Sequence, residues 1–444
     1  MLEPCTLPGL EGAARCGKLE VFEDRKARTG RKIGLKVAVL PAREGAPSRE
    51  PLFALAGGPG ESSTASARLF DQILDGVRRE RDVVLVDLRG TGGSNALHCP
   101  VPGNDDDPQS YLGDLFPLEP IRDCLRRLEA APAHYTTSEA AADLEEVRAA
   151  LGAERIHLYG VSYGSRAVLV YLREHPERVL SAVLHGVVPT DMRVPLHYAE
   201  DAQRSLDLLL AECEADASCR THYPGLRDKL AAVEKRLAAS PAEVEIEDPK
   251  TKKRVRLRIS PELFHEELRW RLYGEGENVV PSYIQRASEG DFSALAATLL
   301  RQRRALASGV ISLGTLLSVT CAEDVPFFTS EEARRLAAGS FLGTSRVDQQ
   351  VRACSVWPRG DVPAGYSQPV RSNVPVLLIS GERDPVTPPR WGEQVARHLP
   401  RSRHVVFRRG SHAVRSPCVR QILADFVARG TVEGLDTSCS EQAA

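Results

Sequence analysis

Short apolar segments alternate with helical segments along two stretches of this chain, and the alternation limits the folds that it can adopt. Each apolar segment has the length of a β-strand, and turn residues and a helical pattern follow it. We predict strands over residues 19–23, 33–40, 52–56, 82–86, 156–159, 179–184, 374–380 and 404–407, and helices over 118–129, 138–151, 166–174, 389–399 and 414–429. Such a chain forms an α/β fold with a mostly parallel central sheet and helices on both faces.

The alternation is interrupted once, by a mainly helical segment that contains a predicted hairpin over residues 244–259. We therefore divide the chain into the first part of the core (1–188), a cap or lid (189–348) and the second part of the core (349–444). The cap is inserted after the sixth predicted core strand. It would lie over the carboxyl edge of the sheet, where open parallel sheets bind their ligands.

One serine lies between a predicted strand and a predicted helix, in Gly160-Val161-Ser162-Tyr163-Gly164. A tight strand-to-helix turn with this pattern holds the serine hydroxyl above the sheet edge, and the two glycines prevent clashes in the turn. We predict that Ser162 is a nucleophile. The alternative is an ordinary helix entry in which Ser162 is only the N-cap.

A serine nucleophile needs a base and a carboxylate that orients the base. The loop after strand 374–380 carries Asp384 at its tip, our predicted acid, with Glu382 as the alternative. The loop after strand 404–407 carries His412, our predicted base. Each of the three residues follows its own strand, in the chain order serine, acid, histidine that belongs to nucleophile-elbow enzymes.

Two backbone N–H groups must stabilise the oxyanion that forms during acyl transfer. We predict the N–H of Tyr163, directly after the nucleophile, and the N–H of Gly58 in Gly57-Gly58-Pro59-Gly60 after strand 52–56. A glycine-rich loop can also bind phosphate, but no P-loop lysine follows this one.

Composition narrows the class of protein. The 444 residues carry 58 Lys and Arg against 60 Asp and Glu, a formal net charge of −2. This balance argues against a protein that binds nucleic acid and against one that binds membrane surfaces through a polybasic patch. No apolar run reaches the roughly 18 residues of a membrane span. Cysteine and histidine spacings match no metal template, and the predicted serine chemistry needs neither a metal nor an organic cofactor, so we expect none. We expect a small peptide or ester as the partner, and a monomer.

Ten cysteines are too many for a cytosolic protein of this length to leave unused, and they indicate disulfides in a secreted or periplasmic protein. Spacing does not fix their connectivity, and buried free thiols are the alternative. Pairing of sequence neighbours would join Cys5 with Cys16, Cys99 with Cys124, Cys213 with Cys219, Cys321 with Cys354, and Cys418 with Cys439. The first residues have no signal-peptide pattern, so we expect a mature or recombinant form.

Taken together, the motifs resemble the proline iminopeptidase and tripeptidyl aminopeptidase family of α/β-hydrolases. The resemblance rests on the glycine loop at 57–60, Asp87-Leu88-Arg89-Gly90-Thr91-Gly92-Gly93-Ser94, the serine motif, and the segments 381–387 and 410–412. Cys321-Ala322-Glu323-Asp324 and the paired cysteines are similar to the secreted bacterial tripeptidyl aminopeptidase branch. Ala56 departs from the pattern, because many family members have a histidine there.

The resemblance implies an α/β-hydrolase fold and a prolyl- or tripeptidyl-type aminopeptidase that forms an acyl-enzyme on Ser162. Such an enzyme needs a carboxylate for the substrate ammonium, and Glu323 and Asp324 are the candidates. An ordinary acidic pair at a helix end is the alternative, and three other acids of the cap compete with it: Glu200, Glu266 and Glu267. The same residues could also serve a carboxylesterase or lactonase, because a fold does not fix a function. A non-catalytic binding protein on a hydrolase scaffold is the third hypothesis.

Overall fold

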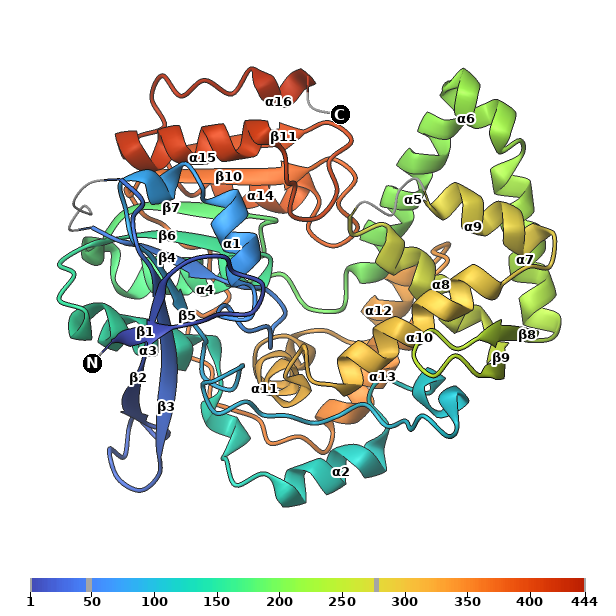
Figure 1. The fold of residues 1–444 in the computed structure, drawn as a ribbon, viewed down its shortest axis with the longest axis horizontal. Helices are drawn as coiled ribbons and strands as arrows, with labels where there is room; N and C mark the ends of the chain where they lie inside the picture. The colour runs from blue at the N-terminus through green and yellow to red at the C-terminus, as the bar shows by residue number, and fades with distance from the viewer. Residues whose placement is uncertain (1, 45–49, 275–278, 443–444) are drawn as a thin grey trace.

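The computed structural model describes residues 2–44, 50–274 and 279–442. Its main feature is a nine-stranded sheet with the strand order β1-β2-β3-β5-β4-β6-β7-β10-β11 (Figure 1). Neighbouring strands from β5 to β11 run parallel, and β1, β2 and β3 form an antiparallel edge. The strands are β1 (Glu3–Cys5), β2 (Ala14–Phe22), β3 (Lys32–Leu40), β4 (Leu52–Leu55), β5 (Val83–Val86), β6 (Ile156–Val161), β7 (Val179–His185), β10 (Val376–Gly381) and β11 (Ser402–Phe407).

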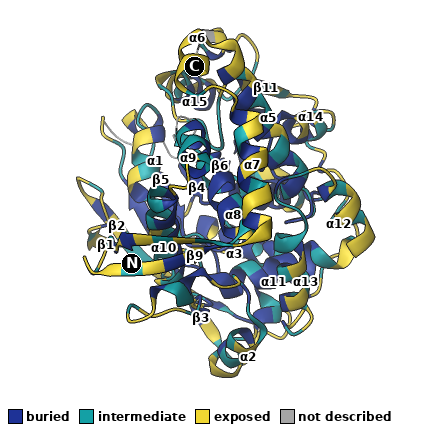
Figure 2. Ribbon diagram, turned by 90° about the vertical axis from the view of Figure 1, so that its right-hand side faces the viewer, coloured by how far each residue is buried: buried dark blue, intermediate teal, exposed yellow. Residues whose placement is uncertain are grey.

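The central strands are buried because helices cover both faces of the sheet, as their continuous apolar sequences require. Residues of α3, α4 and α14 pack in one core against the sheet, and residues of α1 and α15 pack in a second core against its opposite face. Figure 2 shows the buried central strands and the more exposed outer helices. These helices are α1 (Ala67–Ile73), α3 (Thr137–Ala150), α4 (Tyr163–Glu174), α14 (Pro389–Ala396) and α15 (Pro417–Arg429).

Most of the cap packs around a hydrophobic core of its own, which lies to one side of the sheet (Figure 1). Tyr111 and Leu112, from the loop before α2 (Leu118–Arg127), complete that core. The cap contains α5 (Tyr198–Ala215), α6 (Ala217–His222), α7 (Leu226–Ala239), β8 (Ala242–Glu247), β9 (Arg254–Ile259), α8 (Pro261–Arg271), α9 (Val279–Ser288), α10 (Ser293–Ala307), α11 (Leu313–Glu323) and α12 (Ser330–Ala337), and α13 (Ser345–Cys354) crosses its end. The division at residues 188 and 348 stays a prediction.

The α/β-hydrolase architecture expected from the sequence is confirmed, and every strand predicted from it overlaps a strand of the structure. β1 is additional, because a three-residue strand is too short to show an alternating pattern. Counted with β1, seven strands of the sheet precede the cap. Within the described ranges, we find no helix that is both long enough and apolar enough to cross a bilayer.

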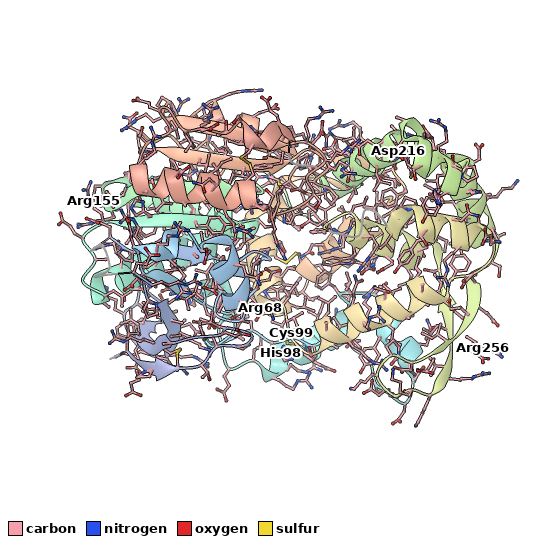
Figure 3. The ribbon with its side chains drawn as sticks, turned by 45° about the horizontal axis from the view of Figure 1, so that its top comes forward. Arg68, His98, Cys99, Arg155, Asp216 and Arg256 are labelled. Carbon is pink, nitrogen blue, oxygen red and sulfur yellow. A yellow bond between two sulfur atoms is a disulfide. The ribbon has the colours of Figure 1, made fainter. Side chains whose placement is uncertain are left out.

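Five disulfides join the ten cysteines, each between sequence neighbours. Cys5–Cys16 ties β1 to β2, and Cys418–Cys439 ties α15 to α16 (Cys439–Gln442). Cys99 lies near the junction between the sheet and the cap, whereas Asp216 and Arg256 mark the far side of the cap (Figure 3). The bond from Cys99 to Cys124 therefore fastens the chain where these two parts meet.

Candidate active site

Ser162 lies at a sharp turn between β6 and α4, with φ of 55° and ψ of −126°. A residue with a side chain rarely adopts such a conformation, which costs about 1–3 kcal/mol and is found mainly at functional sites. The Ser162 N–H donates to the carbonyl of His185 at 2.8 Å. A methyl group on Gly160 would lie 2.3 Å from the Gly164 oxygen, so the crossing of strand and helix requires glycine here.

His412 and Asp384 lie in the loops that follow β11 and β10. Their Nδ1 and Oδ2 atoms are 2.8 Å apart. Three further groups donate to the fully buried Asp384 carboxylate: the N–H of Val386, and the N–H and hydroxyl of Thr387, at 2.6–2.8 Å. These contacts fix the carboxylate and, through it, the orientation of the imidazole ring.

The two groups stabilise each other's charged forms. Burial alone would raise the pKa of Asp384, but His412 and the hydrogen bonds hold the pKa below its ordinary value. Burial alone would lower the pKa of His412, but Asp384 raises the pKa above that of a free histidine. Glu382, the alternative acid, instead accepts a hydrogen bond from the Arg409 N–H at 3.1 Å. The geometry therefore favours Asp384 as the partner of His412.

Ser162 and His412 line one cavity of about 530 Å³, between the sheet and the cap. Tyr273 of the cap packs edge-on against His412, with ring centroids 5.2 Å apart. A methyl group on Gly186 would lie 3.2 Å from His412 Cε1, so the ring also packs closely against backbone. A cavity of this volume can enclose a small ligand, and the packing holds the imidazole in place beside it.

The glycine loop lies in the wall of the same cavity. Gly58 has φ of +107°, which favours glycine, and a methyl group on Gly57 would lie 3.0 Å from Ser162 Cβ. Tyr163 is the first residue of α4, so its N–H has no acceptor within the helix. Both candidate oxyanion donors therefore lie near Ser162, Gly58 in the cavity wall and Tyr163 next in the chain.

Asp87 holds the chain that leaves the glycine loop. Its carboxylate accepts hydrogen bonds from the Ser62 hydroxyl, from the N–H and hydroxyl of Thr64, and from the Gly93 N–H, at 2.8–2.9 Å. Arg89 of the same motif binds Asp143 through Nε and Nη2, each at 2.7 Å. The motif at residues 87–94 therefore positions the loop rather than contacting the cavity.

Comparison with known proteins agrees with this geometry. Residues 50–414 match the family model described as the alpha/beta hydrolase fold. The chain belongs to the α/β-hydrolase family. It is 23% identical to the serine protease Hip1 of Mycobacterium tuberculosis, over 97% of this chain and 88% of that protein. It is also 23% identical to the tripeptidyl aminopeptidase of Streptomyces lividans, over 97% of this chain and 84% of that protein. The resemblance to α/β-hydrolase serine peptidases is thus confirmed.

One solved structure similar to this hydrolase is a thermophilic esterase from Thermogutta terrifontis. The two share 14% sequence identity with a TM-score of 0.43, over 94% of this chain and all of the esterase.

Glu323 and Asp324 do not lie where the resemblance led us to expect them. Both are buried at the end of α11, with exposed fractions of 1% and 0%, and neither lines the cavity of this hydrolase. Glu323 accepts hydrogen bonds from the N–H and hydroxyl of Thr137 and from Tyr366. Asp324 pairs with the buried Arg166 at 3.0 Å. Because their oxygens are occupied in the core, the expectation that they face the substrate amine is corrected.

The competing acids of the cap are paired as well, and none of them lines the cavity. Glu200 contacts His197 at 2.8 Å, Glu266 contacts Arg303 at 2.7 Å, and Glu267 contacts Arg271 at 2.9 Å.

Glu61 is the acidic side chain that the sequence reasoning missed. Among the residues that the structure describes, it is the only carboxylate that lines the cavity. A methyl group on Gly57 would lie 3.4 Å from Glu61 Oε2 and 3.0 Å from Ser162 Cβ, so the acid and the nucleophile flank the same point. Burial raises the pKa of Glu61, although the charge of His412 opposes the rise. Its place directly after the glycine loop is the sequence signal that could have revealed it.

Proposed function

We propose that this hydrolase is a serine aminopeptidase that acts on short peptides with a free N-terminus. The observation that carries the proposal is the position of Glu61, a cavity carboxylate beside Ser162. The names of the relatives, a serine protease and a tripeptidyl aminopeptidase, support peptide substrates. His412, the Gly57 N–H and Arg415 already favour the charged form of Glu61, but burial outweighs them. A substrate ammonium would add the opposite charge that a partly buried carboxylate requires.

In the proposed mechanism, Ser162 Oγ attacks the carbonyl carbon of the peptide bond while His412 takes the hydroxyl proton. Asp384 orients the imidazole and stabilises its charged form. The N–H groups of Gly58 and Tyr163 bind the oxyanion. His412 then gives the proton to the leaving amine, which leaves an acyl-enzyme on Ser162. Water repeats the sequence, with His412 as its base, and releases the acyl fragment.

Glu61 would bind the substrate ammonium close to the scissile carbonyl. In an N-terminal residue, only the Cα atom separates the amine from the carbonyl carbon. The amine of a tripeptidyl acyl group would lie about 7 Å farther away, at roughly 3.4 Å for each additional residue. The position of Glu61 beside Ser162 therefore favours the release of one residue at a time over the release of tripeptides.

The test compares kcat/KM for one peptide reporter with a free N-terminus and for the same reporter with an acetylated N-terminus. An aminopeptidase cleaves only the free form, and Ser162→Ala abolishes that cleavage. Glu61→Gln should lower the ratio of free to acetylated cleavage by about 10- to 100-fold, because a hydrogen bond to a charged group is worth about 1.5–3 kcal/mol. Glu382→Gln is the matched control, since Glu382 lies outside the cavity. Equal cleavage of both reporters would show that no free amine is required and would contradict the aminopeptidase proposal. Hydrolysis of esters alone would instead identify an esterase or lactonase.

We also propose that the protein works in an oxidising compartment outside the cytoplasm. Five disulfides support this proposal, because reduced thiols prevail in the cytosol. Thiol titration of the unfolded protein, purified without reductant from secreted or periplasmic material, should detect no free cysteine. A titre of several thiols per chain would contradict the proposal.

A further inference from the structure

Four arginines line the same cavity as Ser162 and His412, and two of them are Arg269 in α8 and Arg346 in α13 of the cap. Of the other two, Arg271 pairs with Glu267, and Arg415 lies after His412 in the core. Arg269 and Arg346 also line a neighbouring cavity of about 340 Å³. They therefore lie between the two spaces. Arg269 is buried, with an exposed fraction of 6%.

Neither arginine has an acidic partner among the described residues, by the criterion of a nitrogen–oxygen distance of at most 4.0 Å. Arg269 Nη1 donates to the hydroxyl of Tyr273 at 2.8 Å, and its guanidinium lies 5.3 Å from the ring centre of Tyr198. Arg346 Nη1 donates to Gln350 Oε1 at 2.7 Å. Neutral oxygens and aromatic rings hold both side chains in place, and within the described ranges Glu266 acts on their charges only from beyond contact distance.

Two carboxylates of α8 already have partners of their own. Glu266 pairs with Arg303 and Glu267 pairs with Arg271. Burial lowers the pKa of Arg346 to about 10, and the charge of Arg269 contributes to the decrease. Taking a charge out of water costs several kcal/mol unless an opposite charge compensates it. Tyr273, Tyr198 and Glu266 outweigh burial for Arg269 and raise its pKa, so the cost of burial falls on Arg346, where a bound anion would reduce it.

The two arginines lie within reach of the nucleophile. Tyr273 contacts both His412 and Arg269: its ring packs against the imidazole, and its hydroxyl accepts the hydrogen bond from the guanidinium. One tyrosine side chain thus separates the imidazole from the guanidinium. A peptide of two or three residues, at about 3.4 Å per residue, spans such a distance.

We propose that Arg269 and Arg346 bind a carboxylate of the substrate. Guanidinium groups suit this task, because their planar donors match the two oxygens of a carboxylate. The proposal rests on the proposed function for its peptide chemistry. With the amine at Glu61, the carboxylate would belong to the leaving fragment, either as its C-terminus or as an Asp or Glu side chain. Glu61 and the arginine pair would then recognise the two ends of a short, doubly charged peptide.

The experiment measures kcat/KM for four matched substrates. Alanyl-alanine and alanyl-alaninamide differ in the C-terminal carboxylate, and the amides of alanyl-aspartate and alanyl-asparagine differ in the side-chain carboxylate. We expect at least one charged member to be cleaved about tenfold better than its neutral partner, and the pair that shows the difference identifies the source of the carboxylate. Equal rates within both pairs would overturn the proposal.

The variants Arg269→Gln and Arg346→Gln should reduce that preference to about onefold. Arg346→Lys, which keeps the charge but loses the planar donors, should retain part of it. Arg335→Gln, on an exposed arginine of α12, is the control and should keep the full preference. Circular dichroism and thermal melting establish that each variant is folded. A preference that survives in both glutamine variants contradicts the assignment.

A binding measurement separates this proposal from the proposed function. Calorimetry on Ser162→Ala should show that alanyl-alanine binds about tenfold more tightly than its amide, and Arg346→Gln in that background should remove the difference. If this holds but wild type cleaves no free peptide, the anion site stands and the aminopeptidase proposal fails. The amides of alanyl-aspartate and alanyl-asparagine are compared in the same way. If free peptides are cleaved but neither pair shows a difference in binding, the anion site fails alone.

Discussion

The carboxyl edge of the sheet and the cap contribute to the cavity in different ways. The sheet edge supplies Ser162, Asp384 and His412, each from a loop that directly follows a strand. The cap supplies Arg269 and Tyr273 from the end of α8, and Arg346 from α13, which lies more than 70 residues further along the chain. The edge carries the groups of the proposed chemistry, and the cap carries charges that can select the substrate. The comparison suggests that reaction and specificity are separable in this hydrolase.

The two regions also differ in the partners of their buried arginines. Arg166, in α4 beneath the cap, donates to Asp324 and to the carbonyl of Met192. Arg269 is similarly buried, but it has no acidic partner within the described ranges. A paired charge indicates a structural role, whereas an unpaired charge at a cavity wall indicates a ligand.

Ser162→Ala should lower kcat by about 10⁴- to 10⁶-fold, because the proposed covalent step is lost. The measurement is single-turnover and steady-state cleavage of a free peptide, with the melting temperature as the control for folding. A loss of less than about tenfold would contradict the assignment of Ser162 as the nucleophile.

Asp384→Asn should lower kcat by about 10⁴-fold and should also change the pH profile. Protonated His412 cannot accept the serine proton, so activity is lost as the pH falls through the pKa of His412. Asp384 raises that pKa, so the acidic limb of kcat/KM should move to lower pH in the variant. Glu382→Asn is the control and should leave the limb in place. An unshifted limb in Asp384→Asn would show that Asp384 is not the partner of His412.

Asp324→Ala should lower the free energy of unfolding by about 3–5 kcal/mol, because Arg166 would stay buried without its partner. Urea denaturation followed by tryptophan fluorescence measures the change. A loss below about 1 kcal/mol would mean that the Arg166–Asp324 pair is not a structural element.

Arg346→Met should change the free energy of unfolding least, and in the opposite direction to Asp324→Ala. Removing an uncompensated charge should leave the free energy of unfolding unchanged or raise it by up to about 1 kcal/mol, as is common where residues serve function rather than stability. The same urea titration compares it with Asp324→Ala. If Arg346→Met costs more than about 2 kcal/mol, the two arginines do not differ in the way proposed here.

The sequence predicts the sheet edge well and the cap poorly, for a physical reason. Apolar runs and turn residues identify the strands. Ser162, Asp384 and His412 each follow the end of such a strand, so their order along the chain is enough to predict them. The partners of Glu323 and Asp324 come from α3, α4 and the segment before β10, which only tertiary packing brings together. The helical pattern over residues 261–271 likewise does not tell which side chain meets the cavity. Glu61 adjoins a motif that the sequence reveals, but the sequence alone does not show that its side chain turns toward Ser162.

The most direct test of the central claim is mass spectrometry of the products released from a free hexapeptide over time. If Glu61 binds the substrate amine, the enzyme should release one residue at a time. The penta-, tetra- and tripeptide that lack one, two and three N-terminal residues should then appear in turn. Release of intact tripeptides would place the amine site farther from Ser162 than Glu61. Internal cleavage, or an uncut peptide in the presence of active ester hydrolysis, would contradict the aminopeptidase account altogether.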